Sequence, residues 1–215
     1  MIKFPFILSS KMVATILVSL CRLLTGIRSR WLAPLPDKQV RIYYANHSSH
    51  LDGLVIWASM PRHLRSQVHP VAAADYWSKT RLRRYLAKYV FHAVLVERRT
   101  VEGRAEARKN PLTPLLETLE RNQSLILFPE GTRGDGENIQ SFKSGVYHLA
   151  RQYPDVELVP VWLENLNRVL PKGSKLVVPF ICSATFGVPV TGLQEGEDKA
   201  AFLARIKAAL EEMAP

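Results

Sequence analysis

The sequence predicts an α/β fold in which a mostly parallel central sheet is flanked by helices on both faces. Short, largely apolar runs recur along the chain, as in strands that are buried on both sides. Segments with helical periodicity lie between these runs, and this alternation favours parallel strands joined by crossover helices. The chain has 215 residues, of which 47% are hydrophobic, so one substantial core is expected. We expect a single α/β domain at residues 31–215.

The expected elements follow in order after a proline-punctuated connector at residues 31–36. Runs rich in Val, Ile, Leu or aromatic residues predict strands at residues 40–45, 68–73, 93–96, 124–128, 156–162 and 176–182. Helical patterns between them predict helices at residues 51–59, 76–89, within 101–121 and at 145–153. A last helix, at residues 198–213, is amphipathic through Phe202, Leu203, Ile206, Ala209 and Leu210.

Residues 1–30 are expected to form an amphipathic helix that lies in a membrane interface. The apolar stretch between Lys11 and Arg22 is shorter than the roughly 20 residues that span a bilayer. Arg28 and Arg30 close the segment, where their charges can meet lipid phosphates. The face assigned to the membrane consists of Val13, Ile16, Leu17, Leu20, Leu24 and Ile27. A signal peptide and a helix packed on the domain's own core are the alternatives.

The net charge of +10 indicates an anionic partner. Phosphate groups and a membrane surface with anionic lipid fit this charge. We expect no nucleic acid, because no zinc-finger spacing, aromatic RNA-binding strand or basic heptad helix occurs. Cys21 and Cys182 fit a reducing compartment. A peripheral or monotopic protein at the cytoplasmic face of the cell (inner) membrane is therefore expected. Arg81, Arg83, Arg84 and Lys88 form one basic helix face. This face is either solvated or set against anionic headgroups or the phosphates of a ligand.

The most informative motif, at residues 46–52, directly follows the first expected strand. Its His47 and Asp52 meet only if the chain turns between them, because five residues along a continuous helix would point them apart. A carboxylate that holds one nitrogen of an imidazole leaves the other free as a general base. Sites of parallel sheets lie at the carboxyl ends of strands, as this motif does. We predict His47 as the base and Asp52 as its partner; the alternative is a structural pair at a helix start.

A second polar loop, at residues 129–134, follows the strand expected at residues 124–128. The guanidinium fork of Arg133 suits a phosphate group. Glu130 is expected to position a substrate or to brace this arginine. Backbone N–H groups near Gly131 and Thr132 are candidates for binding a phosphate or a developing oxyanion. Taken alone, the loop could also be an ordinary turn with a surface ion pair.

No metal and no cofactor are expected. His47, His50 and Asp52 hint at metal ligation, but no further clustered His or Cys completes a ligand shell. The glycine-rich motifs of dinucleotide and P-loop nucleotide sites do not occur.

The two loops resemble blocks of a known family, the glycerolipid acyltransferases of the 1-acylglycerol-3-phosphate acyltransferase type. Residues 46–52 match its N-H-x-x-x-x-D block, and residues 128–133 match its F-P-E-G-T-R block without a substitution. Residues 141–145 resemble the F-K-x-G segment that follows, and residues 159–161 look like its V-P-[IV] strand. The blocks occur in the family's order within about residues 40–185.

This resemblance implies transfer of a fatty acyl group from a thioester to the hydroxyl of a lysophospholipid, with 1-acyl-glycerol-3-phosphate as the first candidate and phosphatidic acid as product. The donor, acyl-CoA or acyl-carrier protein, is then a co-substrate. His47 and Asp52 are the catalytic residues that the resemblance implies. The implied substrate-binding set is Glu130, Gly131, Thr132 and Arg133, assisted by Arg98.

The second block departs from the family's G-x-I-F-I-x-R pattern. Residues 92–98 retain Arg98, but His92 stands in the place of the glycine and Leu95 in that of the phenylalanine. Because the family's block is tied to binding the acceptor, other acceptors stay open: glycerol-3-phosphate, another lysophospholipid or an ornithine-type lysolipid. A thioester or phosphoester hydrolase that activates water with His47, and a non-catalytic membrane-binding module, are the further alternatives.

Overall fold

The computed structural model describes residues 9–35, 39–97, 110–136, 138–169, 178 and 180–215. A central sheet is built from β1 (Arg28–Trp31), β2 (Arg41–Ala45), β3 (Val68–Ala73), β4 (Val94–Val96), β5 (Ser124–Leu127), β6 (Glu157–Glu164) and β7 (Ser183–Phe186). Its order is β1-β7-β6-β2-β5-β3-β4. Neighbouring strands run parallel except β6 and β7, which are antiparallel. The expected mostly parallel sheet is confirmed.

The two strands at one edge of the sheet differ from the prediction. Where residues 176–182 are described, they form no strand, so the strand predicted there is wrong and β7 begins at Ser183 instead. Phe180 and Ile181 are 39% and 59% exposed, so their hydrophobicity does not report burial in a sheet. β7 pairs with β1, whose polar sequence gives no strand pattern. Pairing with a neighbour, rather than local pattern, makes β1 a strand.

Four helices lie where the sequence predicts them: α1 (Ser10–Thr25), α2 (Asp52–Ser59), α7 (Gly145–Gln152) and α9 (Lys199–Glu211). The helix expected at residues 76–89 is broken into α4 (Ala74–Trp77), α5 (Arg81–Tyr85) and the π-helical turn η1 (Leu86–Val90). Thr80 causes the break: its backbone is extended and its hydroxyl caps α5. Of residues 101–121 the structure describes 110–121, which contain α6 (Thr113–Glu120). Short additional turns are α3 (Arg62–Arg65) and α8 (Leu166–Val169).

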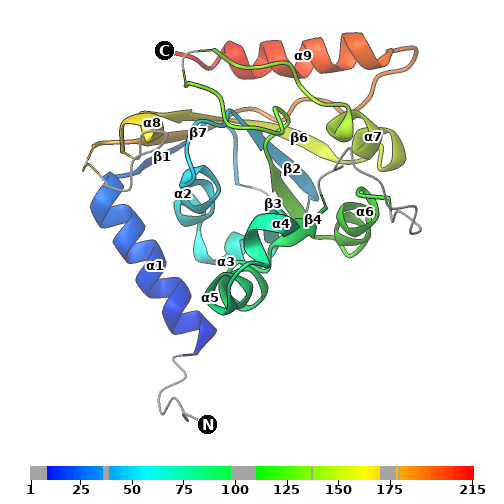
Figure 1. Cartoon of the computed structure of the whole chain (residues 1–215). Coiled ribbons are helices and arrows are strands. Elements are labelled where there is room, and N and C mark those ends of the chain that lie inside the picture. The colour runs from blue at the N-terminus through cyan, green and yellow to red at the C-terminus, as the bar shows by residue number, and fades with distance from the viewer. Residues whose placement is uncertain (1–8, 36–38, 98–109, 137, 170–177, 179) are drawn as a thin grey trace.

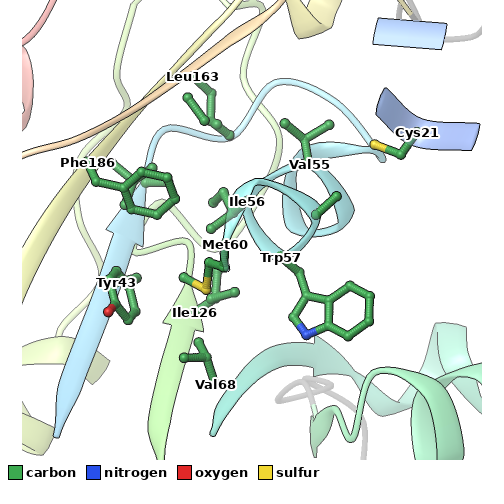
Figure 2. Packing of buried hydrophobic residues seen from close by; sticks show 14 of the residues in the cluster. Cys21, Tyr43, Val55, Ile56, Trp57, Met60, Val68, Ile126, Leu163 and Phe186 are labelled. Carbon is green, nitrogen blue, oxygen red and sulfur yellow. The ribbon is translucent and has the colours of Figure 1, made fainter. Parts of the chain in front are cut away.

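The sheet separates two hydrophobic clusters, because alternate residues of a strand point to opposite faces. In β2, Tyr43 and Ala45 belong to one cluster, whereas Ile42 and Tyr44 belong to the other. The first cluster packs α1, α2 and α3 against the sheet, and Figure 2 shows Ile56 of α2 within it. The second packs α6, α7 and α9 on the opposite face, and Figure 1 shows α9 and α2 on the two sides of the sheet. Burial on both faces explains the nearly continuous apolar strands.

Helix α1 is apolar on two sides. Val18, Cys21 and Thr25 are buried, and the guanidinium of Arg22 donates to the carbonyl oxygen of Ala58 at 2.9 Å. On the other side a stripe of side chains is 47–80% exposed: Met12, Ile16, Leu20 and Leu23. The face that the sequence assigns to the membrane is therefore split, because its other members, Val13, Leu17, Leu24 and Ile27, are partly covered by the domain. Among the described helices, none is long and apolar enough to cross a bilayer.

His92 stands in a backbone conformation that favours glycine, with φ at 48°. It occupies the position where the resembled family carries glycine, so the departure seen in the sequence has a conformational cost. The carbonyl oxygen of His92 accepts a hydrogen bond from Nδ1 of the buried His69 at 2.8 Å. A backbone carbonyl is retained whatever residue stands at position 92.

We expect His92→Gly to raise the free energy of unfolding by about 0.5–1 kcal/mol. Relief of the left-handed strain contributes about 1–2 kcal/mol, and the greater chain entropy of glycine when unfolded offsets part of it. Urea unfolding followed by circular dichroism measures the difference. His63→Gly in α3, where no positive φ requires glycine, is the control and should lower stability. A loss of stability in His92→Gly would contradict the prediction.

Candidate active site

Two loops meet at the carboxyl end of the sheet because β2 and β5 are neighbours. Their parallel register pairs Tyr44 with Leu127, so both chains leave the sheet at the same edge. The backbone N–H of Gly134 then donates to the carbonyl oxygen of His47 at 2.8 Å. The two loops that the sequence singled out separately are thus in direct contact.

The predicted contact between His47 and Asp52 is present. Nδ1 of His47 lies 2.8 Å from Oδ2 of Asp52, whose side chain is fully buried. The same oxygen accepts hydrogen bonds from the backbone N–H groups of Ser48 at 2.7 Å and Ser49 at 2.8 Å. The turn before α2 therefore wraps around this carboxylate, as the five-residue spacing requires. A carboxylate only accepts hydrogen bonds, so Nδ1 carries the proton and Nε2 the lone pair.

The imidazole of His47 is held on one face and open at one edge. The ring of Phe128 stacks on it with centroids 4.2 Å apart and an interplanar angle of 19°. The side chain is 22% exposed, and Nε2 forms no hydrogen bond within the described residues. This nitrogen is available to take a proton from a bound hydroxyl. The sequence places Phe128 in the F-P-E-G-T-R block but assigns it no role; its position directly after β5 and before the second loop is the signal that points to one.

Glu130 ties the two loops together rather than facing solvent. It is 2% exposed, and its Oε1 accepts from the backbone N–H of His47 at 2.7 Å. Its Oε2 accepts from the backbone N–H of Gln140 at 3.0 Å. Burial raises the pKa of the Glu130 carboxyl, while the two backbone donors act in the opposite direction. This geometry favours a bracing role over contact with a substrate, and the braced group is the backbone of His47.

Asn46 anchors the first loop to the neighbouring strand β6. Its side-chain amide donates to the carbonyl oxygen of Leu163 at 2.9 Å and accepts from the Leu163 N–H at 2.8 Å. This pair of bonds fixes the backbone one residue before His47. Asn46 belongs to the motif that the sequence singled out, but its supporting role follows only from the adjacency of β2 and β6.

The second loop has a tight turn at Gly131. Its φ of 72° favours glycine, and an added Cβ would lie 3.3 Å from Cγ of Lys143. The Gly131 N–H already donates to the carbonyl oxygen of Phe128 at 3.0 Å, so it is not free to bind a ligand. Thr132 is exposed, and its hydroxyl contacts the side chain of Gln140 at 3.2 Å. Of the two predicted backbone donors, only that of Thr132 has no acceptor among the residues that the structure describes.

Arg133 lies near the imidazole of His50 in the first loop. It forms no hydrogen bond or ion pair with residues that the structure describes, and its guanidinium is partly exposed. Its charge reaches His50: burial and then Arg133 lower the pKa of the His50 imidazole, with a further contribution from His47. The predicted partner Arg98 lies outside the described residues. Of the two predicted arginines, the structure describes Arg133 and places it near His50.

A small pocket lies behind the backbone of His47. It has a volume of about 20 Å³ and is lined by Asn46, His47, Ser48, Glu130, Gly136, Asn138, Ile139 and Trp162. Such a volume holds about one water molecule.

These features define the class of the protein: an α/β domain that holds a His–Asp pair next to an arginine at the carboxyl end of its sheet. Comparison with known sequences gives the family. Residues 27–164 match the acyltransferase family, and the chain belongs to it.

Individual relatives agree with this family. A 1-acyl-sn-glycerol-3-phosphate acyltransferase of Limnanthes alba is 26% identical over 74% of the chain and 56% of its own length. The Limnanthes douglasii protein of the same name is 26% identical over 71% of the chain and 51% of its length. The chain thus spans about half the length of these relatives. The crystal structure of the 1-acyl-sn-glycerophosphate acyltransferase PlsC from Thermotoga maritima matches with a TM-score of 0.68 and 20% identity, over 96% of this chain and 82% of that one, which shows a shared fold.

Proposed function

We propose that this protein transfers a fatty acyl group from acyl-CoA or acyl-carrier protein to the hydroxyl of 1-acyl-glycerol-3-phosphate, giving phosphatidic acid. The observation that carries the proposal is the 2.8 Å contact of His47 with Asp52, which leaves Nε2 open, in a loop whose His50 lies near Arg133. Membership of the acyltransferase family supports the reaction class. The named relatives support the acceptor.

The chemistry needs no acyl-enzyme, because the acceptor alcohol is itself the nucleophile. Nε2 of His47 takes the proton of the hydroxyl as its oxygen attacks the thioester carbonyl carbon. The new C–O bond forms, the C–S bond breaks, and the imidazolium returns the proton to the leaving thiolate. Asp52 stabilises the imidazolium between these steps. Arg133 holds the phosphate of the acceptor through charge-assisted hydrogen bonds.

A panel of acceptors tests this function. Purified full chain in mild detergent is given palmitoyl-CoA and one of four acceptors: 1-acyl-glycerol-3-phosphate, glycerol-3-phosphate, a zwitterionic lysophospholipid or an ornithine-type lysolipid. Thiol release and lipid products are measured together. We expect the fastest transfer to 1-acyl-glycerol-3-phosphate. Thiol release that is equally fast without any acceptor would indicate a hydrolase, and transfer only to acceptors without phosphate would remove the assigned role of Arg133.

We also propose that the protein docks on the cytoplasmic face of the membrane through the exposed stripe of α1. Met12, Ile16, Leu20 and Leu23 recur at helical spacing on the side that faces away from the core. Apolar side chains of this kind insert among lipid acyl chains, and the chain's net positive charge favours anionic headgroups. The acyl chains of both substrates then stay near the bilayer.

Replacing two residues of this stripe is expected to weaken membrane binding at least about tenfold, since a charged side chain disfavours insertion. The double variant Ile16→Glu, Leu23→Glu suits the test better than deletion of residues 1–30, which would also remove most of β1 and the buried side chains of Val18 and Cys21. Flotation with vesicles of phosphatidylcholine and phosphatidylglycerol measures binding. Val188→Glu, at an exposed position outside α1, is the matched control. Equal binding by all three proteins would contradict the proposal.

A further inference from the structure

Three side chains from separate elements stack beside the His47–Asp52 pair. The imidazole of His50 lies over the ring of Tyr76, with centroids 5.8 Å apart and an interplanar angle of 21°. The guanidinium carbon of Arg83 lies 4.0 Å from the centroid of the same ring. His50 belongs to the turn between His47 and Asp52, whereas Tyr76 lies in α4 and Arg83 in α5. We call these three residues the stacked ladder.

The stacked ladder holds the guanidinium of Arg83 in place near His50 without pairing it with a carboxylate among the described residues. Arg83 donates one hydrogen bond, from Nη1 to the carbonyl oxygen of Tyr76 at 3.4 Å. Among the described residues it has no carboxylate partner. A guanidinium stacked on a tyrosine keeps its remaining N–H groups in one plane, which suits the oxygens of a phosphate. Tyr76 therefore orients a cation that is left unpaired.

Positive charge gathers on both sides of His50. The charges that reach its ring come from Arg133 of the second loop, His47 of its own turn and Arg83 of α5, and the one opposing charge is Asp52. Asp52 is already occupied by three hydrogen bonds at one oxygen and is buried. Two arginines and an imidazole near the proton acceptor make a place for an anion.

We propose that His50, Tyr76 and Arg83 form a phosphate subsite next to His47, which together with Arg133 holds the phosphate group of a substrate. This inference rests on the proposed function for the identity of that substrate. The shared chemistry is a phosphate ester, which can come from the acceptor or from the coenzyme A donor. The subsite lies outside the sequence blocks that resemble the family, except for His50, which occupies a variable position of the first block.

The structure separates Arg83 from its basic neighbours. Arg81, Arg84 and Lys88 are exposed, whereas Arg83 is partly buried by its contact with Tyr76. A general basic face would treat these residues alike. A defined subsite predicts that Arg83 matters and that Arg84, which carries the same charge one residue away, does not.

Kinetics provide the first test, with Arg83→Gln and His50→Gln against Arg84→Gln as the matched control. We expect Arg83→Gln to raise one KM about five- to twentyfold, with kcat within about twofold, as for loss of uniform binding. A rise in the KM for 1-acyl-glycerol-3-phosphate assigns the subsite to the acceptor, and a rise in that for palmitoyl-CoA assigns it to the donor. Unchanged KM values for both substrates in Arg83→Gln and His50→Gln would overturn the subsite, as would an equal effect of Arg84→Gln.

Ligand binding followed by NMR provides a test that does not need turnover. Glycerol-3-phosphate is added to the full chain in detergent micelles, and the imidazole C–H signals of His50 are followed against pH. A bound phosphate raises the pKa of His50, since a nearby negative charge favours imidazolium. The rise should be present in Arg84→Gln and reduced in Arg83→Gln. If the pKa of His50 rises in this way but no acyl transfer is found, the subsite stands and the proposed function is refuted. If acyl transfer is found but neither the pKa of His50 nor a KM changes, the subsite alone is refuted.

Discussion

His47→Ala is expected to lower the rate of acyl transfer at least about a hundredfold, because general-base catalysis contributes about 10²- to 10⁴-fold. The reason lies in the geometry: Nε2 is the edge of the ring that stays open, and Asp52 holds the opposite nitrogen at 2.8 Å. Thiol release from palmitoyl-CoA with saturating 1-acyl-glycerol-3-phosphate measures the rate.

The fold should survive this replacement, so that a lost rate reports chemistry. Asp52 keeps the backbone donors of Ser48 and Ser49, and the turn before α2 stays closed. Circular dichroism and the unfolding midpoint check this point. His63→Ala, at an exposed histidine of α3, serves as control and should change the rate by less than about twofold. A rate within tenfold of wild type in His47→Ala would show that the imidazole is not the base.

Glu130→Ala is expected to lower the free energy of unfolding by about 2–4 kcal/mol. It leaves the backbone N–H groups of His47 and Gln140, whose bonds to Glu130 are partly buried, without these acceptors, and an unsatisfied buried donor costs about 1–3 kcal/mol. Removing a buried carboxylate, whose pKa burial raises, offsets part of this loss. The rate of acyl transfer should fall as well, because the backbone of His47 loses one of its two ties to the second loop.

Urea unfolding and acyl transfer are measured on the same preparations of Glu130→Ala. Glu120→Ala, an exposed glutamate at the end of α6, removes the same charge and should change stability by less than about 0.5 kcal/mol. Stability close to wild type together with a raised KM for the acceptor would contradict the bracing role. That result would instead restore direct contact between Glu130 and the substrate.

Much of the site could be predicted because its chemistry is local. His47 and Asp52 lie five residues apart in one turn, so the spacing already limits how they can meet. For Glu130 the sequence left two roles open, positioning a substrate or bracing Arg133, and neither involved the backbone of His47. That contact joins residues 83 positions apart and exists because β2 and β5 are neighbours in the sheet. No local pattern encodes such a neighbourhood.

The same limit explains the errors in the fold. Five strands follow from their apolar runs, because burial on both faces imposes that pattern. The run before β7 is equally apolar, yet Phe180 and Ile181 are exposed. In α1, apolar residues lie on two sides, and the sequence pattern could not tell the side that packs on the core from the side that stays exposed. An apolar side chain can be buried, but tertiary packing determines which apolar side chains are buried.

The sequence by itself determined the class of fold, the family and the dyad, since these depend on residue types at short spacing. Only the tertiary structure decided that Glu130 grips the backbone of His47, that Phe128 stacks on its ring, and that Arg83 stands over Tyr76 near His50. These contacts join loops and helices that are distant along the chain. They arise from strand order and helix packing, which sum the interactions of the whole domain rather than those of neighbouring residues.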